Sequence, residues 1–110
     1  MAGWWWVIKF DPNKPTLKLS EVDKSIIDFA LSQVPEEFMA RDVAKVILKY
    51  YNIIDGHDKS IIWSLKRKAS FWLNRYVKEK RVRIIDKRSK GYVYEKLMSD
   101  HWFYRNSKKV

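Results

Sequence analysis

Residues 58–78 read DKSIIWSLKRKASFWLNRYVK, and the apolar residues of this segment recur at helical spacing. Asp58 is a favourable N-cap, so the pattern predicts a helix from Asp58 to Lys78, about 30 Å long. One side of that helix is expected to pack against the body of the protein. The residues on this side are Ile61, Ile62, Leu65, Ala69, Trp72 and Tyr76.

The opposite side of the predicted helix is polar and cationic. Between Lys59 and Lys78 there are Lys and Arg residues but no Asp or Glu, whereas a merely soluble helix more often alternates Glu with Lys. Residue types that can contact base edges line this side, namely Ser60, Trp63, Arg67, Ser70 and Asn74. Cations suited to phosphate contacts accompany them, namely Lys59, Lys66, Lys68, Arg75 and Lys78. A solvated helix face is the alternative interpretation.

The segments before this helix alternate between strand and helix patterns. Large apolar residues alternate over residues 2–10, which predicts a strand. Helical periodicity predicts helices over residues 20–32 and 40–51. Ser20 and Asp23 resemble a capping box at the start of the first helix.

Shorter segments connect these elements and follow the long helix. Phe38 and Met39 form an apolar bridge between the first two helices, and residues 52–56 have the composition of a turn. From Arg81 the period changes to that of a strand over residues 81–85. A polar turn over 86–91 and a second strand over 92–97 complete a predicted hairpin: its turn contains Asp86, Lys87, Arg88, Ser89, Lys90 and Gly91.

Length, composition and charge restrict the possible functions. The chain has 110 residues, a mass of 13.3 kDa and no cysteine, which indicates one domain and excludes disulfides and cysteine-based metal centres. Residues 1–58 carry 7 Lys and Arg against 9 Asp and Glu, a net charge of −2, whereas residues 59–110 carry 16 against 4, a net charge of +12. Such a cationic half favours a polyanionic partner, most commonly nucleic acid. The Lys-rich surface of a thermophile protein is the alternative explanation.

The order of helix, bridge, helix, turn, long basic helix and hairpin resembles the winged helix-turn-helix family. The segments that carry the resemblance are 38–44 (FMARDVA), 61–76, 82–85 (VRII) and 90–95 (KGYVYE), within about residues 20–97. The link between the second and third helices is longer than the usual turn of the family. Within this family, the chain resembles small archaeal or archaeal-virus transcription regulators. The resemblance implies an α+β fold that binds DNA with its third helix in the major groove and its hairpin, or wing, on the backbone or minor groove.

This interpretation divides the chain into three parts. Residues 1–16 form an N-terminal strand or arm, residues 17–98 form the winged helix-turn-helix domain, and residues 99–110 form an aromatic and basic extension. Cations gather near the tip of the wing, where we expect phosphate or minor-groove contacts and where Gly91 permits a tight turn. These wing residues are Lys87, Arg88 and Lys90.

The N-terminal tryptophans are a second candidate binding surface. Trp4, Trp5 and Trp6 place aromatic rings on both faces of one short predicted strand. We expect a homodimer that uses this strand, with a two-fold axis that matches a pseudo-palindromic DNA site. A mixed sheet within one chain is the alternative. Stacking on single-stranded bases is disfavoured because consecutive residues of a strand point to opposite faces.

The sequence gives little support for catalysis. His57 and His101 are the only histidines and form no metal-binding motif, and the chain has no Gly-rich phosphate loop. We therefore expect no enzyme, no metal, no cofactor and no small-molecule substrate. No segment has the ~20 consecutive apolar residues of a membrane span, so a cytoplasmic location is expected, in the host cytoplasm if the protein is viral.

Three functions remain compatible with the sequence. The first is sequence-specific binding of double-stranded DNA by a transcription regulator. The second is architectural, chromatin-like DNA binding with little sequence preference. The third is a winged-helix module that docks its basic face on an acidic protein.

Overall fold

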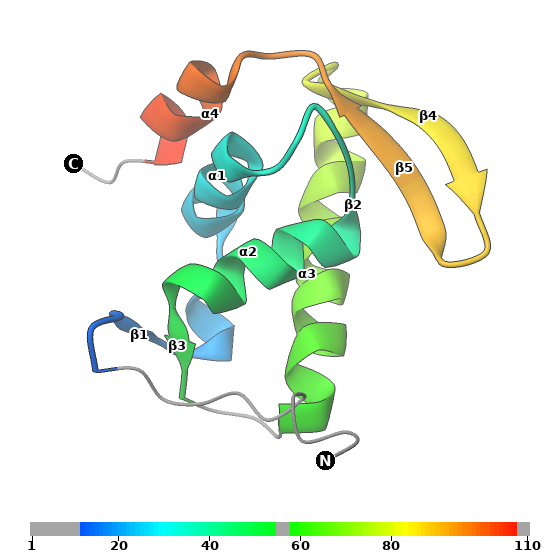
Figure 1. Cartoon of the computed structure of the whole chain (residues 1–110). Helices are drawn as coiled ribbons and strands as arrows, with labels where there is room; N and C mark the ends of the chain where they lie inside the picture. The colour runs from blue at the N-terminus through cyan, green and yellow to red at the C-terminus, as the bar shows by residue number, and fades with distance from the viewer. Residues whose placement is uncertain (1–11, 55–57, 108–110) are drawn as a thin grey trace.

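The computed structural model describes residues 12–54 and 58–107 as an α+β fold (Figure 1), which confirms the predicted class. Three helices, a three-stranded antiparallel sheet and a terminal helix make up most of it. In chain order the elements are β1 (Thr16–Leu17), the 3-10 helix η2 (Leu19–Glu21), α1 (Lys24–Gln33), β2 (Glu37–Met39), α2 (Ala40–Tyr50), β3 (Asn52–Ile53), α3 (Asp58–Lys78), β4 (Val82–Arg88), β5 (Gly91–Lys96) and α4 (Asp100–Ser107).

The core lies between α1, α2 and α3. Ile27, Leu31, Val43 and Ile47 are fully buried and meet the inner side of α3. On α3 the predicted inward residues Ile61, Leu65, Ala69 and Tyr76 are buried, whereas Ile62 and Trp72 are only half-buried. Leu73 is fully buried although it lies outside the predicted stripe. The buried side of α3 is therefore displaced towards Leu73 relative to the predicted stripe, and α1, α2 and β4 all pack against this helix.

The start of α1 differs from the prediction. Asp23 is its N-cap, and its carboxylate accepts hydrogen bonds from the backbone N–H groups of Ser25 at 3.1 Å and Ile26 at 3.4 Å. Ser20 lies in η2, so the predicted capping box between Ser20 and Asp23 is wrong. Both residue types are favourable N-caps, and the sequence alone does not select between them. The second and third helices agree closely with their predicted ranges.

The sheet has the strand order β2-β5-β4. The predicted bridge at Phe38 and Met39 is its third strand, in which Phe38 pairs with Tyr94 and the two rings stack with centroids 5.8 Å apart. The turn is shorter than the predicted range of 86–91. A bulge between Ile84 and Asp86 shifts the register, β4 continues as a strand to Arg88, and the turn itself consists of Ser89 and Lys90. A bulge inserts one extra residue and so disguises the period-2 pattern of a strand.

Two short strands hold the N-terminal part of the chain to the link between α2 and α3. Thr16 pairs with Asn52 and Leu17 with Ile53 in parallel. The side-chain amide of Asn52 also donates to the carbonyl of Lys14 at 3.0 Å. Part of the predicted turn over 52–56 is therefore strand. The predicted strand over residues 2–10, with Trp4, Trp5 and Trp6, lies outside the described residues.

Helix α4 within the predicted C-terminal extension packs against α1. Phe103 is fully buried, and its ring centroid lies 6.3 Å from that of Tyr76. The buried amine of Lys96 donates to the carbonyls of Leu31 at 2.9 Å and Val34 at 2.7 Å and pairs with Asp100. Lys96 thus joins β5 to the last turn of α1 and the first turn of α4. In the described part of the chain, none of the helices has the length and apolar character to cross a membrane.

Candidate nucleic-acid interface

The outward side of α3 is the surface at which most of the predicted contact residues gather. Ser60, Trp63, Arg67 and Asn74 are exposed and Ser70 is half-buried. Among the predicted phosphate contacts, Arg75 and Lys78 are exposed and Lys66 and Lys68 are half-buried. The side chain of Lys59 lies outside the described residues. None of the described residues of the two predicted sets belongs to the core, because the apolar residues of α3 fix which side of the helix packs inward.

The cations of this surface are not neutralised by neighbouring carboxylates. In residues 12–54 and 58–107, the five ion pairs involve none of Lys66, Arg67, Lys68, Arg75 and Lys78. A cation without a partner acid keeps its full charge for a polyanion. This part of the α3 surface can therefore attract a phosphate backbone.

Two guanidinium groups lie against aromatic rings of the same helix. The Arg67 guanidinium lies 4.9 Å from the centroid of the Trp63 ring, and the Arg75 guanidinium lies 5.3 Å from that of Trp72. Cation–π contacts limit the freedom of a long side chain without removing its charge. Arg67 is therefore held near Trp63 on the outer surface of α3.

Phe71 is a surface residue that the sequence analysis missed. Its side chain is 56% exposed, similar to Trp63 at 58%. Trp63, Arg67 and Phe71 follow one another at four-residue spacing, which places them along one side of α3. This spacing is the sequence signal that could have identified Phe71. The outer surface of α3 thus combines cations, amide and hydroxyl groups with two accessible aromatic rings.

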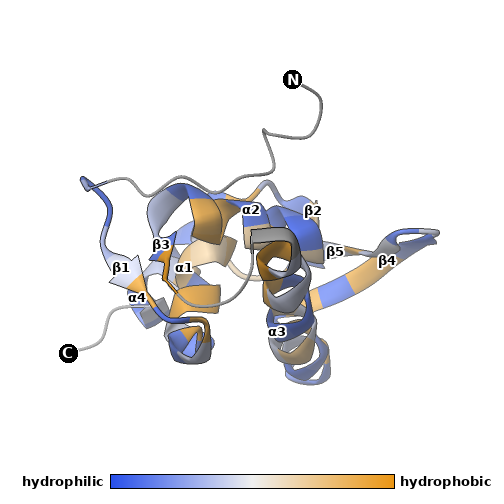
Figure 2. Ribbon diagram, turned by 90° about the horizontal axis from the view of Figure 1, so that it is seen from below, coloured by the Kyte–Doolittle hydropathy of each residue, from blue (hydrophilic) through white to orange (hydrophobic). Residues whose placement is uncertain are grey.

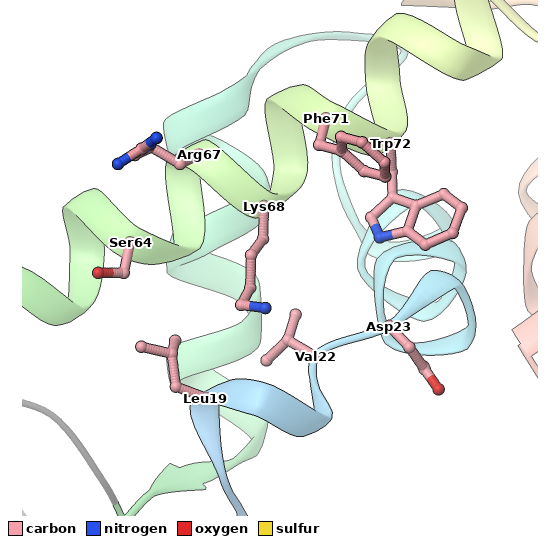
Figure 3. A pocket seen from close by; sticks show the side chains of 8 residues that line it. All are labelled: Leu19, Val22, Asp23, Ser64, Arg67, Lys68, Phe71 and Trp72. Carbon is pink, nitrogen blue, oxygen red and sulfur yellow. The ribbon is translucent and has the colours of Figure 1, made fainter.

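Lys68 is directed away from this outer surface. It lines a groove of about 560 Å³ between α3 and the segment that leads from η2 into α1. Figure 3 shows its amine end extending towards Leu19 and Val22, while Arg67 points away from them. Phe71 and Trp72 line the same groove further along α3. The Lys68 side chain consequently extends away from a partner on the outer side of α3.

The β4–β5 hairpin is the second predicted contact element. In Figures 1 and 2 it extends from the helices on one side of α3, with α1 and α4 on the other side. Lys87, Arg88 and Lys90 are exposed, as is Asp86, whose carboxylate pairs with Arg88 at 3.2 Å. Gly91, the first residue of β5 after the turn, has a φ of +136°, a conformation that favours glycine. Lys87 and Lys90 thus remain as the unpaired cations among the three predicted wing residues.

The α3 helix and the hairpin also meet through their side chains. Lys66 and Ser70 of α3 and Lys90 of the hairpin line one cavity, together with Arg41 from the first turn of α2. Arg41 is not among the contact residues predicted from the sequence. Its position relative to Lys66 and Lys90 depends on tertiary packing, so no local pattern could have identified it.

The described residues show no arrangement suited to metal chemistry. Within these residues no group of three or more His, Cys, Asp or Glu side chains could hold a metal ion. His101 is exposed, and His57 lies outside the described residues. Comparison with known proteins gave no match to a family model, a curated protein or a solved structure.

Proposed function

We propose that this chain is a sequence-specific double-stranded DNA-binding protein that regulates transcription and has no enzymatic activity. In this proposal α3 lies in the major groove and the β4–β5 hairpin acts as the wing of a winged helix-turn-helix domain. The observation that carries the proposal is the outward side of α3, where unpaired cations surround Arg67, Ser70 and Asn74.

The chemistry of the outward side of α3 supports DNA as the binding partner, rather than polyanions in general. Arg can donate two hydrogen bonds to guanine, and Asn can both donate to and accept from adenine. Trp63 and Phe71 can meet the methyl groups of thymine, which are apolar features of the major groove. Cations alone would give affinity without sequence preference. The mixture of groups therefore supports sequence readout.

The arrangement of elements supports the winged-helix part of the proposal. The chain runs from α1 through β2 and α2 to the long α3 and then into the hairpin, and β2 joins the hairpin through β5. The hairpin projects beside α3 (Figure 2) and carries Lys87 and Lys90 as exposed cations. A helix in the groove and a neighbouring cationic hairpin would contact one duplex at two places.

One observation favours a second candidate function, docking on an acidic protein. Trp63 and Phe71 together expose more apolar surface on α3 than a solvated helix needs. Aromatic residues and Arg are also enriched at the centres of protein interfaces. The same side of α3 would then contact a protein partner instead of a duplex.

Selection of bound duplexes from a random-sequence library at ~0.15 M salt tests these functions. Sequence-specific binding predicts enrichment of one motif by the wild-type chain. An Arg67→Ala, Asn74→Ala double variant should lose that enrichment, and an Arg105→Met variant, altered on α4, should retain it.

The other results of the selection are equally informative. Binding without enrichment, together with a steep dependence on salt, would contradict sequence specificity and indicate an architectural DNA-binding protein. Absence of duplex binding at this salt concentration would contradict both DNA-binding functions and leave protein docking.

A further inference from the structure

A small cavity of about 100 Å³ lies where α2, α3 and the β4–β5 hairpin meet. The first turn of α2 contributes Arg41 to its wall, and α3 contributes Lys66 and Ser70. Lys90 and Tyr92 of the hairpin line the opposite part. Three separate elements thus each contribute one cationic residue to the lining of a single small space.

This cavity gathers positive charge without a compensating acid. Arg41, Lys66 and Lys90 all line it, and none of its lining residues is Asp or Glu. None of the three cations takes part in an ion pair within the described residues. Like charges that converge in a partly enclosed space repel one another, and an anion between them would reverse this interaction. The cavity therefore has the electrostatic character of an anion site.

The Arg41 guanidinium contains a buried donor that no acceptor in the described part of the chain satisfies. Its Nε is buried and has no hydrogen-bond partner among the described residues. Asp42, the next residue in the sequence, does not line the cavity, and its carboxylate accepts a hydrogen bond from the backbone N–H of Met39 at 2.8 Å. A buried donor without an acceptor is unfavourable, and the planar guanidinium matches the oxygens of a phosphate group. The described part of the protein thus leaves Arg41 Nε without an acceptor, in a side chain that lines a cavity suited to an oxyanion.

We propose that this cavity binds one phosphodiester group of the DNA backbone and that Arg41 is a DNA-binding residue. This inference rests on the proposed function. Lys66 and Lys90 hold the phosphate from the α3 and hairpin sides, and the hydroxyl of Ser70 donates a hydrogen bond to it. One phosphate thereby connects α3 to the hairpin and sets how deeply α3 enters the groove. The contact carries no sequence information.

Three variants and a matched control test this site. Arg41→Met removes the charge but keeps the apolar stem, and Arg41→Lys restores a charge. Lys90→Met alters the same cavity from an exposed turn, where the core is not affected. Arg105→Met removes one exposed cation from α4, which lies on the side of the molecule away from the hairpin (Figure 1). Thermal unfolding of each variant shows whether it is folded.

The measurement is duplex affinity by fluorescence anisotropy between about 0.05 and 0.2 M NaCl, on selected and on random duplexes. Loss of one phosphate contact should lower the slope of log affinity against log salt by about 0.9, so the advantage of the wild type shrinks about threefold across this range. We expect this result for Arg41→Met and Lys90→Met on both duplexes. Arg41→Lys and Arg105→Met should keep the wild-type slope.

The outcomes separate this inference from the proposed function. A wild-type slope for folded Arg41→Met and Lys90→Met, on a duplex that the wild type binds, would overturn the phosphate site and leave DNA binding intact. A slope reduced equally by Arg105→Met would overturn it as well, since the effect would then reflect net charge. Failure of the wild type to bind any duplex would refute the proposed function, and the phosphodiester assignment with it.

Discussion

Replacement of Arg67 tests whether the protein recognises the sequence of a duplex or is only attracted by its charge. The Arg67 guanidinium is exposed, is held near the Trp63 ring and has no ion-pair partner in the described residues. Arg67→Ala should lose about 1–3 kcal/mol of binding free energy on the preferred duplex and relax the preference at one base pair. Lys66→Ala should weaken binding to all sequences alike.

Affinities of both variants for the preferred duplex and its single-base variants measure this difference in sequence preference. Equal losses on preferred and random DNA would argue against base contact by Arg67.

Phe71 and Leu73 are apolar neighbours on α3 with opposite environments. Leu73 is fully buried, so Leu73→Ala should lower the free energy of unfolding by about 2–5 kcal/mol. Phe71 is 56% exposed, and Phe71→Ala should change stability by less than about 0.5 kcal/mol while it weakens binding to the preferred duplex. Urea denaturation and duplex titration of both variants check this. A large loss of stability for Phe71→Ala would show that this ring supports the core.

A residue with a positive φ follows the last turn of α3. Lys80 has a φ of 61°, and the backbone N–H groups of Lys80 and Arg81 donate to the carbonyls of Val77 and Tyr76, which is the pattern of a Schellman motif. Glycine adopts this φ without strain, so Lys80→Gly should raise the free energy of unfolding by about 0.5–1 kcal/mol. Lys80→Ala removes the same charge but keeps the Cβ, and it should give no gain. The denaturant midpoints of the two variants show whether the gain in stability comes from relief of backbone strain at residue 80.

The contact between α1 and α3 gives a pH-dependent prediction. Asp28 is fully buried and accepts a hydrogen bond from the Tyr76 hydroxyl, and Lys24 pairs with it at 3.1 Å. Burial raises the pKa of the Asp28 carboxyl above 3.8, although the hydrogen bonds from Tyr76 and Lys24 oppose this. The folded protein therefore holds this proton more tightly than the unfolded chain. The resulting stability is present below pH 3.8 and is lost as the pH rises through the higher folded pKa.

Asp28→Asn removes this titration. The free energy of unfolding of the wild type, relative to that of Asp28→Asn, should fall as the pH rises from about 4 towards 7. Chemical denaturation at several pH values measures the difference. Parallel pH profiles of the two proteins would show that Asp28 does not titrate differently in the folded state.

Elements with long amphipathic patterns could be predicted, whereas those defined by distant partners could not. The periods of α2 and α3 extend over several turns and so gave both helices to within a residue. β2 and β3 have three and two residues, too few to show a period, and they exist because β5 and β1 pair with them. The same distinction holds at the site. The α3 surface follows from helical period, whereas Arg41 reaches Lys66 and Lys90 only through packing.

The N-terminal tryptophans lead to a prediction about the oligomeric state of the protein. Trp4, Trp5 and Trp6 place aromatic rings on both faces of a short predicted segment, so we expect the full chain to form a homodimer. Light scattering at high micromolar concentration should give twice the chain mass of 13.3 kDa. Replacement of the three tryptophans by serine should give the mass of one chain. A single-chain mass for the wild type would exclude the dimer.

Lys96 helps to hold the β4–β5 hairpin in a fixed position relative to the helices. Its amine is anchored to the carbonyls of Leu31 and Val34, so the root of the hairpin is tied to α1 rather than only to α3. The hairpin therefore cannot swivel about its base without breaking buried hydrogen bonds. The buried Lys96 side chain thus helps to fix the distance between α3 and the projecting hairpin. Under the proposed function, it limits which duplex geometries both elements can contact at once.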